Sequence, residues 1–163
     1  MRRDDEFSQF FTSRFDHARR SAFALCGNWS EAEEIAQGAF VKVYAKWPRV
    51  RRDSAEAYLQ TVMTRIFLDA RRRVRGRERS VAEPPDVVSH DPAVPERQGL
   101  MRALQEVPPR QRAALVLRFV LDLSVEQAAD ALGCSPGTVK SQTARGLETL
   151  RAAYLTTDTS ERA

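Results

Sequence analysis

The segment 124–151 contains two helix starts separated by a tight turn, an arrangement that could place a helix in the major groove of DNA. Ser124 and Gln127 have the spacing of a capping box, in which two side chains satisfy free N–H groups at a helix N-terminus. Gly133 stands where the chain must leave this helix through a positive φ angle. Ser135 can cap a second helix, and a proline follows at the first helical position. The segment therefore predicts a helix-turn-helix.

The second helix of this unit is predicted to have a buried side and a polar, partly basic side. Val139, Leu147 and Leu150 are expected to face inward. The residues expected on the outer side are Lys140, Ser141, Gln142, Ala144, Arg145 and Glu148. Lysine and arginine side chains bind phosphates or guanine, and glutamine side chains pair with adenine. This side of the helix therefore suits DNA contact. The alternative is an ordinary helical hairpin with a solvated face.

A dense arginine cluster with interleaved aromatic residues extends from Trp47 to Arg79. Its aromatic members are Trp47, Tyr58 and Phe67, and its basic members are Arg49, Arg51, Arg52, Arg65, Arg71, Arg72, Arg73, Arg75, Arg77 and Arg79. Arginines neutralise phosphates, and aromatic rings stack on unpaired bases at about 1–3 kcal/mol per base. The mixture indicates binding to single-stranded or partly melted DNA. Alternatively, the aromatic residues belong to the core and the arginines form a solvated helix end.

The segment 32–47 has apolar residues at helical spacing and an unusual outer side. Ser30 and Glu33 predict a capping box at its start. The side chains predicted to be buried are Ala32, Ile35, Ala36, Ala39, Phe40, Val43 and Trp47, and those predicted to point outward are Glu34, Gln37, Gly38, Val41 and Lys42. Glycine inside a helix costs about 1 kcal/mol relative to alanine, and valine is apolar. A protein partner would explain both residues, as would drift under weak selection.

The remaining sequence divides into helices, a linker and further helices. Apolar periodicity predicts one helix that ends at Gly27 and another that begins near Ser54. Residues 80–96, SVAEPPDVVSHDPAVPE, contain four prolines and no helical period, which predicts a flexible linker. Short helices are then predicted up to Val107 and over 110–121. No window alternates with period two, so the predicted fold class is all-α.

We expect two small helical domains on these grounds. An N-terminal domain of three or four helices would occupy residues 1–79, and a four-helix domain with the helix-turn-helix would occupy 97–155, followed by a disordered tail over 156–163. The first domain has 17 basic and 11 acidic side chains, the linker has four acidic and no basic ones, and the second domain has eight basic and five acidic ones, within a net charge of +4. Two basic ends around an acidic middle suggest polyanion binding by the ends.

Catalysis, metal binding and cofactor binding are not expected. His17 and His90 have no neighbouring serine, cysteine or carboxylate in a triad-like arrangement, and the chain has no glycine-rich phosphate loop. Cys26 and Cys134 are too few and too far apart for a metal site or a disulfide framework. The N-terminus does not have the pattern of a signal peptide, and no apolar run is long enough to cross a bilayer. We therefore expect a cytoplasmic protein that is not an enzyme.

Four segments, in this order and spacing, resemble the bacterial sigma factors of the sigma-70 family, specifically the small extracytoplasmic-function (ECF) type. They are AEEIAQGAFVKVYAKWPRV (32–50), AYLQTVMTRIFLDARRR (57–73), VPPRQRAALVLRF (107–119) and SVEQAADALGCSPGTVKSQTARGLETLR (124–151). The resemblance covers nearly everything except the first few residues, the linker and the tail. The sequence is most similar in character to the short actinobacterial group of these sigma factors, with Trp-Pro-Arg after the second predicted helix.

The resemblance implies three contact surfaces. Core RNA polymerase would bind, through its β′ clamp helices, to Glu34, Gln37, Phe40 and Val41. The −10 promoter element, with a flipped base and a melted strand, would bind to Trp47, Arg49, Arg51, Arg52, Tyr58, Arg65, Asp69, Arg72 and Arg73. The −35 element would bind as duplex to Thr138, Lys140, Ser141, Gln142, Ala144 and Arg145.

The resemblance also implies further partners, and three residues of this chain depart from the family's usual pattern. The β flap of the polymerase and an anti-sigma protein are further expected partners. The linker would follow the RNA path of the core enzyme. The free protein would be a monomer. Arg65 stands where such proteins commonly have Asn, Gln142 where Arg is common, and Gly38 where Glu is usual. These departures affect the expected promoter sequence and core affinity rather than the class of protein.

Two other functions compete with this interpretation. A dimeric helix-turn-helix regulator on palindromic duplex DNA would explain the segment 124–151 but leaves the arginine cluster unexplained. A non-specific nucleoid-packing protein would show no promoter preference even with polymerase present. Each alternative makes a different prediction for DNA binding in the presence of core polymerase.

Overall fold

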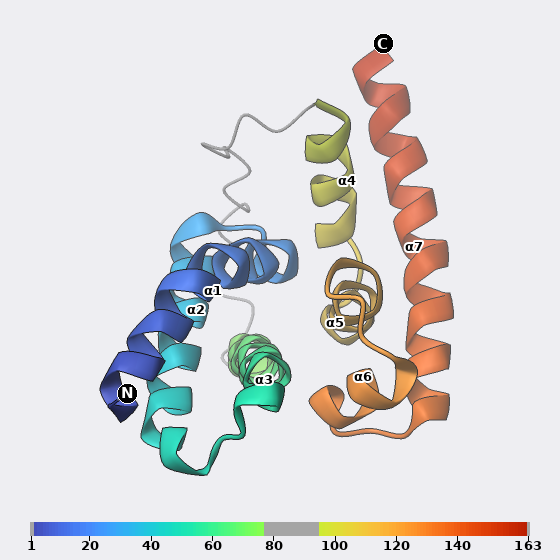
Figure 1. Ribbon diagram of the computed structural model, residues 1–163. Helices are drawn as coiled ribbons and strands as arrows, with labels where there is room; N and C mark the ends of the chain where they lie inside the picture. Colours follow the sequence, from blue (N-terminus) through green and yellow to red (C-terminus); the bar gives the residue numbers. More distant parts are fainter. Residues whose placement is uncertain (1, 77–94, 163) are drawn as a thin grey trace.

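The described residues, 2–76 and 95–162 of a computed structural model, form helices and connecting turns without any strand (Figure 1). The N-lobe consists of α1 (Arg3–Cys26), α2 (Trp29–Ala45) and α3 (Ala55–Gly76). The C-lobe consists of α4 (Pro95–Gln105), α5 (Pro109–Leu115), α6 (Val125–Leu132) and α7 (Pro136–Arg162). The predicted all-α class is confirmed. Residues 80–94 of the predicted linker lie outside the described residues, while its last two residues, 95 and 96, already belong to α4.

Local sequence signals set the ends of the N-lobe helices. Three acidic residues occupy the first turn of α1, where they face the positive end of the helix dipole. Gly27 ends α1 with a φ of 72°, as predicted. The N-cap of α2 is Asn28, whose Oδ1 accepts a hydrogen bond from the backbone N–H of Glu31. The capping box predicted at Ser30 is therefore wrong, because Asn28 caps the helix two residues earlier and leaves Ser30 inside it.

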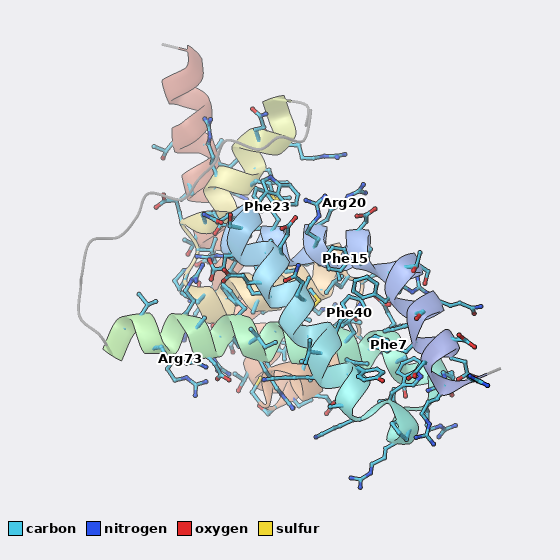
Figure 2. The ribbon with its side chains drawn as sticks, turned by 90° about the vertical axis from the view of Figure 1, so that its left-hand side faces the viewer. Phe7, Phe15, Arg20, Phe23, Phe40 and Arg73 are labelled. Carbon is cyan, nitrogen blue, oxygen red and sulfur yellow. The ribbon has the colours of Figure 1, made fainter. Side chains whose placement is uncertain are left out.

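The N-lobe core is built around Phe40 of α2, which is 2% exposed. Its ring centroid lies 5.0–6.3 Å from those of Phe7, Phe10, Phe11 and Phe15 on α1. Figure 2 shows Phe7 and Phe15 on either side of Phe40 where the two helices meet. The other residues of the segment 32–47 predicted to be inside are also buried. Aromatic packing of this kind fixes the angle between α1 and α2 and orients the outer side of α2.

The C-lobe departs from the predicted continuous helix over 110–121. α5 stops at Leu115, and a π-helical turn (η3, Val116–Val120) follows it. The N–H of Leu121 bonds the carbonyl of Val116, which is the wider spacing of a π turn. Asp122 then adopts a φ of 54°. The bulge re-aims the chain from α5 into α6, so it sets where the helix-turn-helix sits on the lobe.

α7 is longer than the sequence predicted. It continues to Arg162, so the prediction of a disordered tail over 156–163 is wrong for the residues that the helix includes. Once a helix exists, each added residue gains one backbone hydrogen bond, and no glycine or proline interrupts this end. The Thr156 hydroxyl also bonds the carbonyl of Ala152.

The two lobes pack against each other. α3 lies almost end-on in Figure 1, between the α1/α2 pair and the α5/α6 side of the C-lobe. Buried apolar residues of both lobes belong to one continuous core. This arrangement brings the arginine-bearing helix of the N-lobe next to the helix-turn-helix.

Candidate nucleic-acid and protein interfaces

The helix-turn-helix has the local geometry that its sequence predicts. The Ser124 side chain accepts from the backbone N–H of Gln127 at 3.0 Å, and the Gln127 side chain accepts from the backbone N–H of Ser124 at 2.8 Å. Gly133 leaves α6 with a φ of 68°. Ser135 Oγ accepts from the backbone N–H of Thr138 at 3.1 Å at the start of α7. Both helix starts and the turn between them are confirmed.

The buried side of α7 differs from the prediction at one position. Val139 is fully buried and Leu150 is half-buried, but Leu147 is 39% exposed. Gly146 takes the inward position, and a Cβ on it would lie 3.1 Å from the side chain of Leu115. The prediction that Leu147 faces inward is wrong, because at this turn of α7 the residue that meets α5 is Gly146.

The outer side of α7 presents most of the predicted duplex-contact residues. Exposed members are Lys140, Ser141, Ala144 and Arg145, and half-buried members are Thr138 and Gln142. Within the described residues, the Lys140 ammonium and the Arg145 guanidinium are in no ion pair. Their charges are therefore available for phosphates.

Up to Ala70, α3 leaves only a narrow strip of its surface exposed, and residues 72–75 are exposed as well. Arg65, Asp69 and Arg72 recur at intervals of four and three residues and are exposed, and the half-buried Tyr58 continues the strip toward the N-terminus. Arg72 and Asp69 form a surface ion pair at 3.7 Å. Figure 2 shows Arg73 projecting from α3 on the side away from Phe40. The structure thus gathers the predicted residues of α3 on one cationic surface.

The connection between α2 and α3 is anchored by residues that were predicted to contact DNA. Trp47, in a 3-10 turn (η1, Trp47–Arg49), is 1% exposed, so it cannot stack on a base. The Arg52 guanidinium lies 3.8 Å from the centre of its ring and pairs with Glu6 at 2.6 Å. Cation–π and ionic contacts together fasten this loop to α1. Arg49 and Arg51 remain exposed, and Arg51 forms a surface ion pair with Asp53 at 3.4 Å.

A shallow hollow of about 570 Å³ lies beside this loop. It is lined by Glu6, Gln9, Phe10, Ser13, Trp47, Arg52 and Ala55. The buried Nε1 of Trp47 has no hydrogen-bond partner among the described residues. The hollow thus combines an apolar wall with charged side chains at one edge.

The outer side of α2 is exposed and partly apolar. Glu34 and Gln37 are exposed, and Val41 is 68% exposed. Phe40 is not on this side, which corrects its predicted place among the contact residues. Gly38 is half-buried and turned toward α3, where a Cβ would meet Ile66 at an ordinary 3.6 Å. Its prediction as an outward residue is therefore wrong as well.

Family models match both halves of the chain. The sigma-70 region 2 model matches residues 10–78, and the sigma-70 region 4 model matches residues 97–150. The chain belongs to the sigma-70 family of RNA polymerase sigma factors. The N-lobe therefore corresponds to region 2 and the C-lobe to region 4.

Relatives place this sigma factor in the ECF group. It is 37% identical over 159 residues to the ECF sigma factor SigE of Mycolicibacterium smegmatis, of which it spans 61% of the length. It is 34% identical over 161 residues to the sigma-E factor of Streptomyces avermitilis, with 97% of this chain and 90% of that protein covered. The predicted family, type and actinobacterial likeness are confirmed.

Solved structures share the arrangement of both lobes. The sigma factor RpoE of Bartonella quintana, solved in complex with the anti-sigma factor NepR, matches with a TM-score of 0.72 at 28% identity, over 91% of this chain and 96% of that one. CnrH, solved with the cytosolic domain of CnrY, matches with a TM-score of 0.65 at 18% identity, over 91% of this chain and 87% of that one, and shows the fold alone.

Two arginines of the sigma factor have structural roles that the sequence did not reveal. Arg71, counted in the predicted polyanion cluster, pairs with Glu31 at 2.6 Å and lies 4.9 Å from the centre of the Phe67 ring. Arg112 is 6% exposed and donates only to backbone carbonyls. Within a run of arginines, the sequence does not distinguish the side chains that face solvent from those that pack against the core. Only the tertiary packing identifies the structural ones.

Among the described residues we find neither a metal site nor a membrane-spanning helix. No group of His, Cys, Asp and Glu among residues 2–76 and 95–162 could hold a metal ion. None of the described helices combines the length and apolarity needed to cross a bilayer. His17 is exposed on α1, and His90 lies outside the described residues.

Proposed function

We propose that this sigma factor docks on core RNA polymerase and divides promoter recognition between its lobes. The C-lobe reads the −35 duplex through the outer side of α7, and the N-lobe holds the −10 strand through α3 and the loop before it. The observation that carries this proposal is the presence of two separate exposed cationic surfaces, on α3 and α7, in a chain of this family. The dimeric regulator is not favoured, because the whole chain and not only its last part matches sigma factors.

The −10 surface consists of the exposed strip of α3 together with Arg49, Arg51, Arg72 and Arg73. These guanidiniums neutralise strand phosphates. The hollow beside the loop is a candidate site for the flipped base, since an apolar wall accepts the face of a base and the buried Trp47 supports that wall. Trp47 and Arg52 act here as positioning residues rather than contacts.

The polymerase-binding surfaces are the outer side of α2 and an apolar edge of the C-lobe. Glu34, Gln37 and Val41 form the first, which is supported by the exposure of an apolar side chain between polar ones. Phe119 and Val120, both exposed on η3 beside the helix-turn-helix, form the second and suit the β flap. Binding both lobes to one large partner raises the effective concentration of each at its promoter element.

An anti-sigma protein is a further proposed partner, supported by the likeness to RpoE in its complex with NepR. We also propose that the protein acts in the cytoplasm, as an initiation factor without catalytic activity of its own. Both proposals follow from the family rather than from a side-chain constellation in this chain.

Reconstitution with purified core polymerase tests the function. The chain should co-elute with core and direct run-off transcription from a subset of a genomic promoter library. Arg72→Ala combined with Arg73→Ala should keep co-elution but lower open-complex formation about tenfold, equivalent to about 1.4 kcal/mol. The matched control is Arg3→Ala with Arg20→Ala, which removes the same charge from α1, and Figure 2 shows Arg20 far from Arg73. Failure of the native chain to co-elute with core would refute the proposal.

A further inference from the structure

The α2–α3 loop, residues 46–54, is held together by one side chain, Arg52. The Arg52 guanidinium donates to the carbonyl of Val50 at 2.9 Å and to the carbonyl of Trp47 at 3.4 Å. It also lies 3.8 Å from the centre of the Trp47 ring. Since Trp47 starts η1 and Val50 caps its end, Arg52 closes this turn on itself. These contacts shape the loop, but they do not fix where the loop lies on α1.

Glu6 of α1 connects the loop to that helix. Arg52 donates through Nε and Nη2 to Glu6 Oε2, at 2.8 and 2.6 Å. Among the described residues, Glu6 is the one hydrogen-bonding partner of Arg52 that lies outside the loop. Hydrogen bonds between two ionised groups are about twice as strong as neutral ones. The place of the loop on α1 therefore depends on one carboxylate and on the aromatic packing of Trp47.

The first turns of α1 are themselves held in place, so Glu6 is a fixed anchor. Tyr44, near the C-terminal end of α2, donates to Asp4 at 2.9 Å. The centroid of the Phe7 ring lies 4.9 Å from that of Tyr44 and 5.3 Å from that of Trp47. Glu6 stands between Asp4 and Phe7 in the chain. Its carboxylate can therefore hold Arg52 in position rather than move with it.

Two ion pairs frame the hollow beside the loop. Glu6 with Arg52 forms one pair, and Arg14 of α1 pairs with Glu56 of α3 at 3.2 Å. Glu6 and Arg14 are about 12 Å apart along α1, at about 1.5 Å per residue. The α1 residues that line the hollow between them are Gln9, Phe10 and Ser13. Both ion pairs join α1 to the segment on the other side of the hollow, so they set its width.

We propose that Glu6 is a positioning residue for recognition of the −10 element. Through Arg52 it holds the α2–α3 loop in the conformation that gives the hollow its shape, and so it sets how strongly the sigma factor distinguishes one base from another. The effect on base preference rests on the proposed function, whereas the hold of Glu6 on the loop does not. A loose hollow accepts several bases with similar free energies, so a fixed loop favours discrimination. Glu6 precedes residues 10–78, the segment that the region 2 model matches.

Limited trypsin digestion of the full chain, read by mass spectrometry, tests the hold of Glu6 on the loop without polymerase. Trypsin cleaves after arginine, and Arg49 and Arg51 are exposed sites within the loop. Glu6→Gln keeps the side-chain volume but removes the charge. The side chains of Glu6 and Arg52 are 37% and 46% exposed, and a pair so exposed changes an opening equilibrium by up to about fivefold. Cleavage in the loop should become about three- to fivefold faster relative to cleavage after Arg73 in the same chain.

Two further variants show whether the effect passes through Arg52. Asp5→Asn is the matched control, because it removes one negative charge from the same turn of α1 at an exposed position, and its loop should be cleaved at the wild-type rate. Arg52→Gln should speed cleavage after Arg49 at least as much as Glu6→Gln does, and adding Glu6→Gln to it should change nothing further. Equal cleavage of Glu6→Gln and wild type would overturn the proposal, as would a full effect of Glu6→Gln in the Arg52→Gln chain.

Open-complex formation with core polymerase tests the effect on base preference. One active promoter is measured with each base in turn at every position of its −10 element. At the position where wild type discriminates most, Glu6→Gln should lower the ratio of the preferred base to the others about three- to fivefold. Co-elution with core should stay the same, and the melting temperature should change by no more than about 3 °C.

The pattern of losses separates positioning from a merely structural role. Unchanged discrimination in Glu6→Gln would overturn the proposal, as would an equal loss on all promoter variants together with weaker co-elution. A native chain that core polymerase ignores would defeat the proposed function instead. In that case the cleavage rates still decide whether Glu6 holds the loop.

Discussion

Replacement of Arg112 by lysine should destabilise the sigma factor strongly, although it conserves the charge. The Arg112 guanidinium donates to four backbone carbonyls at 2.6–3.1 Å, on Leu25, Leu104, Gln105 and Val107. Burial, followed by the nearby charge of Arg71, lowers its pKa to about 10, so it is still charged at neutral pH. A lysine ammonium has three donors on one atom and cannot reproduce the planar fork.

The magnitude follows from the carbonyls left without a donor. Each buried carbonyl that loses its partner costs about 1–3 kcal/mol, and a lysine leaves at least one or two of the four unpaired. We therefore expect Arg112→Lys to lower the free energy of unfolding by about 2–4 kcal/mol, a loss of about 10 °C in melting temperature.

Urea denaturation followed by circular dichroism measures this change. Arg110→Lys is the matched control, because Arg110 is exposed and, among the described residues, its side chain makes one long hydrogen bond, to the carbonyl of Leu132 at 3.4 Å. The control should stay within about 0.5 kcal/mol of wild type. Equal midpoints for the two variants would show that the carbonyls around Arg112 find other donors, and the reasoning on the buried guanidinium would be refuted.

Three further predictions concern other parts of the chain. Burial raises the pKa of the Cys26 thiol to about 12. Because the unfolded chain then releases this proton first, the free energy of unfolding should fall between about pH 9 and 12, by up to about 1.4 kcal/mol per pH unit. Urea titrations of Cys26→Ala should lack that slope, and an unchanged slope would exclude Cys26 as its source. Gly137→Ala should stabilise α7 by about 1 kcal/mol. Gly146→Ala should not, because the new Cβ at position 146 would lie 3.1 Å from the side chain of Leu115. Equal gains in the urea midpoints of the two variants would contradict the close approach of α5 to α7 at Gly146. Val41→Glu should weaken co-elution with core polymerase about tenfold without changing the melting temperature, and full retention would remove α2 from the polymerase surface.

Much of the N-lobe and of the helix-turn-helix could be predicted because the signals are local. A capping box, a left-handed glycine and a helical apolar period act over a few residues and do not depend on the rest of the fold. The C-terminal end of α1, the start of α6 and the inward residues of α2 were therefore predicted correctly. The Ser30 cap was wrong because Asn28 offers the same kind of signal two residues earlier.

The sequence by itself determined the helices, their turns and the family to which their order belongs. Only the tertiary structure decided which side chains of one chemical type face inward. Arg71 is half-buried, lies on the Phe67 ring and pairs with Glu31, whereas Arg65 of the same cluster stays exposed. Leu147 is 39% exposed, and the close contact of α7 with α5 falls on Gly146 instead. The physical reason is that burial depends on contacts between segments far apart in the chain, and hydrophobic periodicity records only that a helix has an inner side.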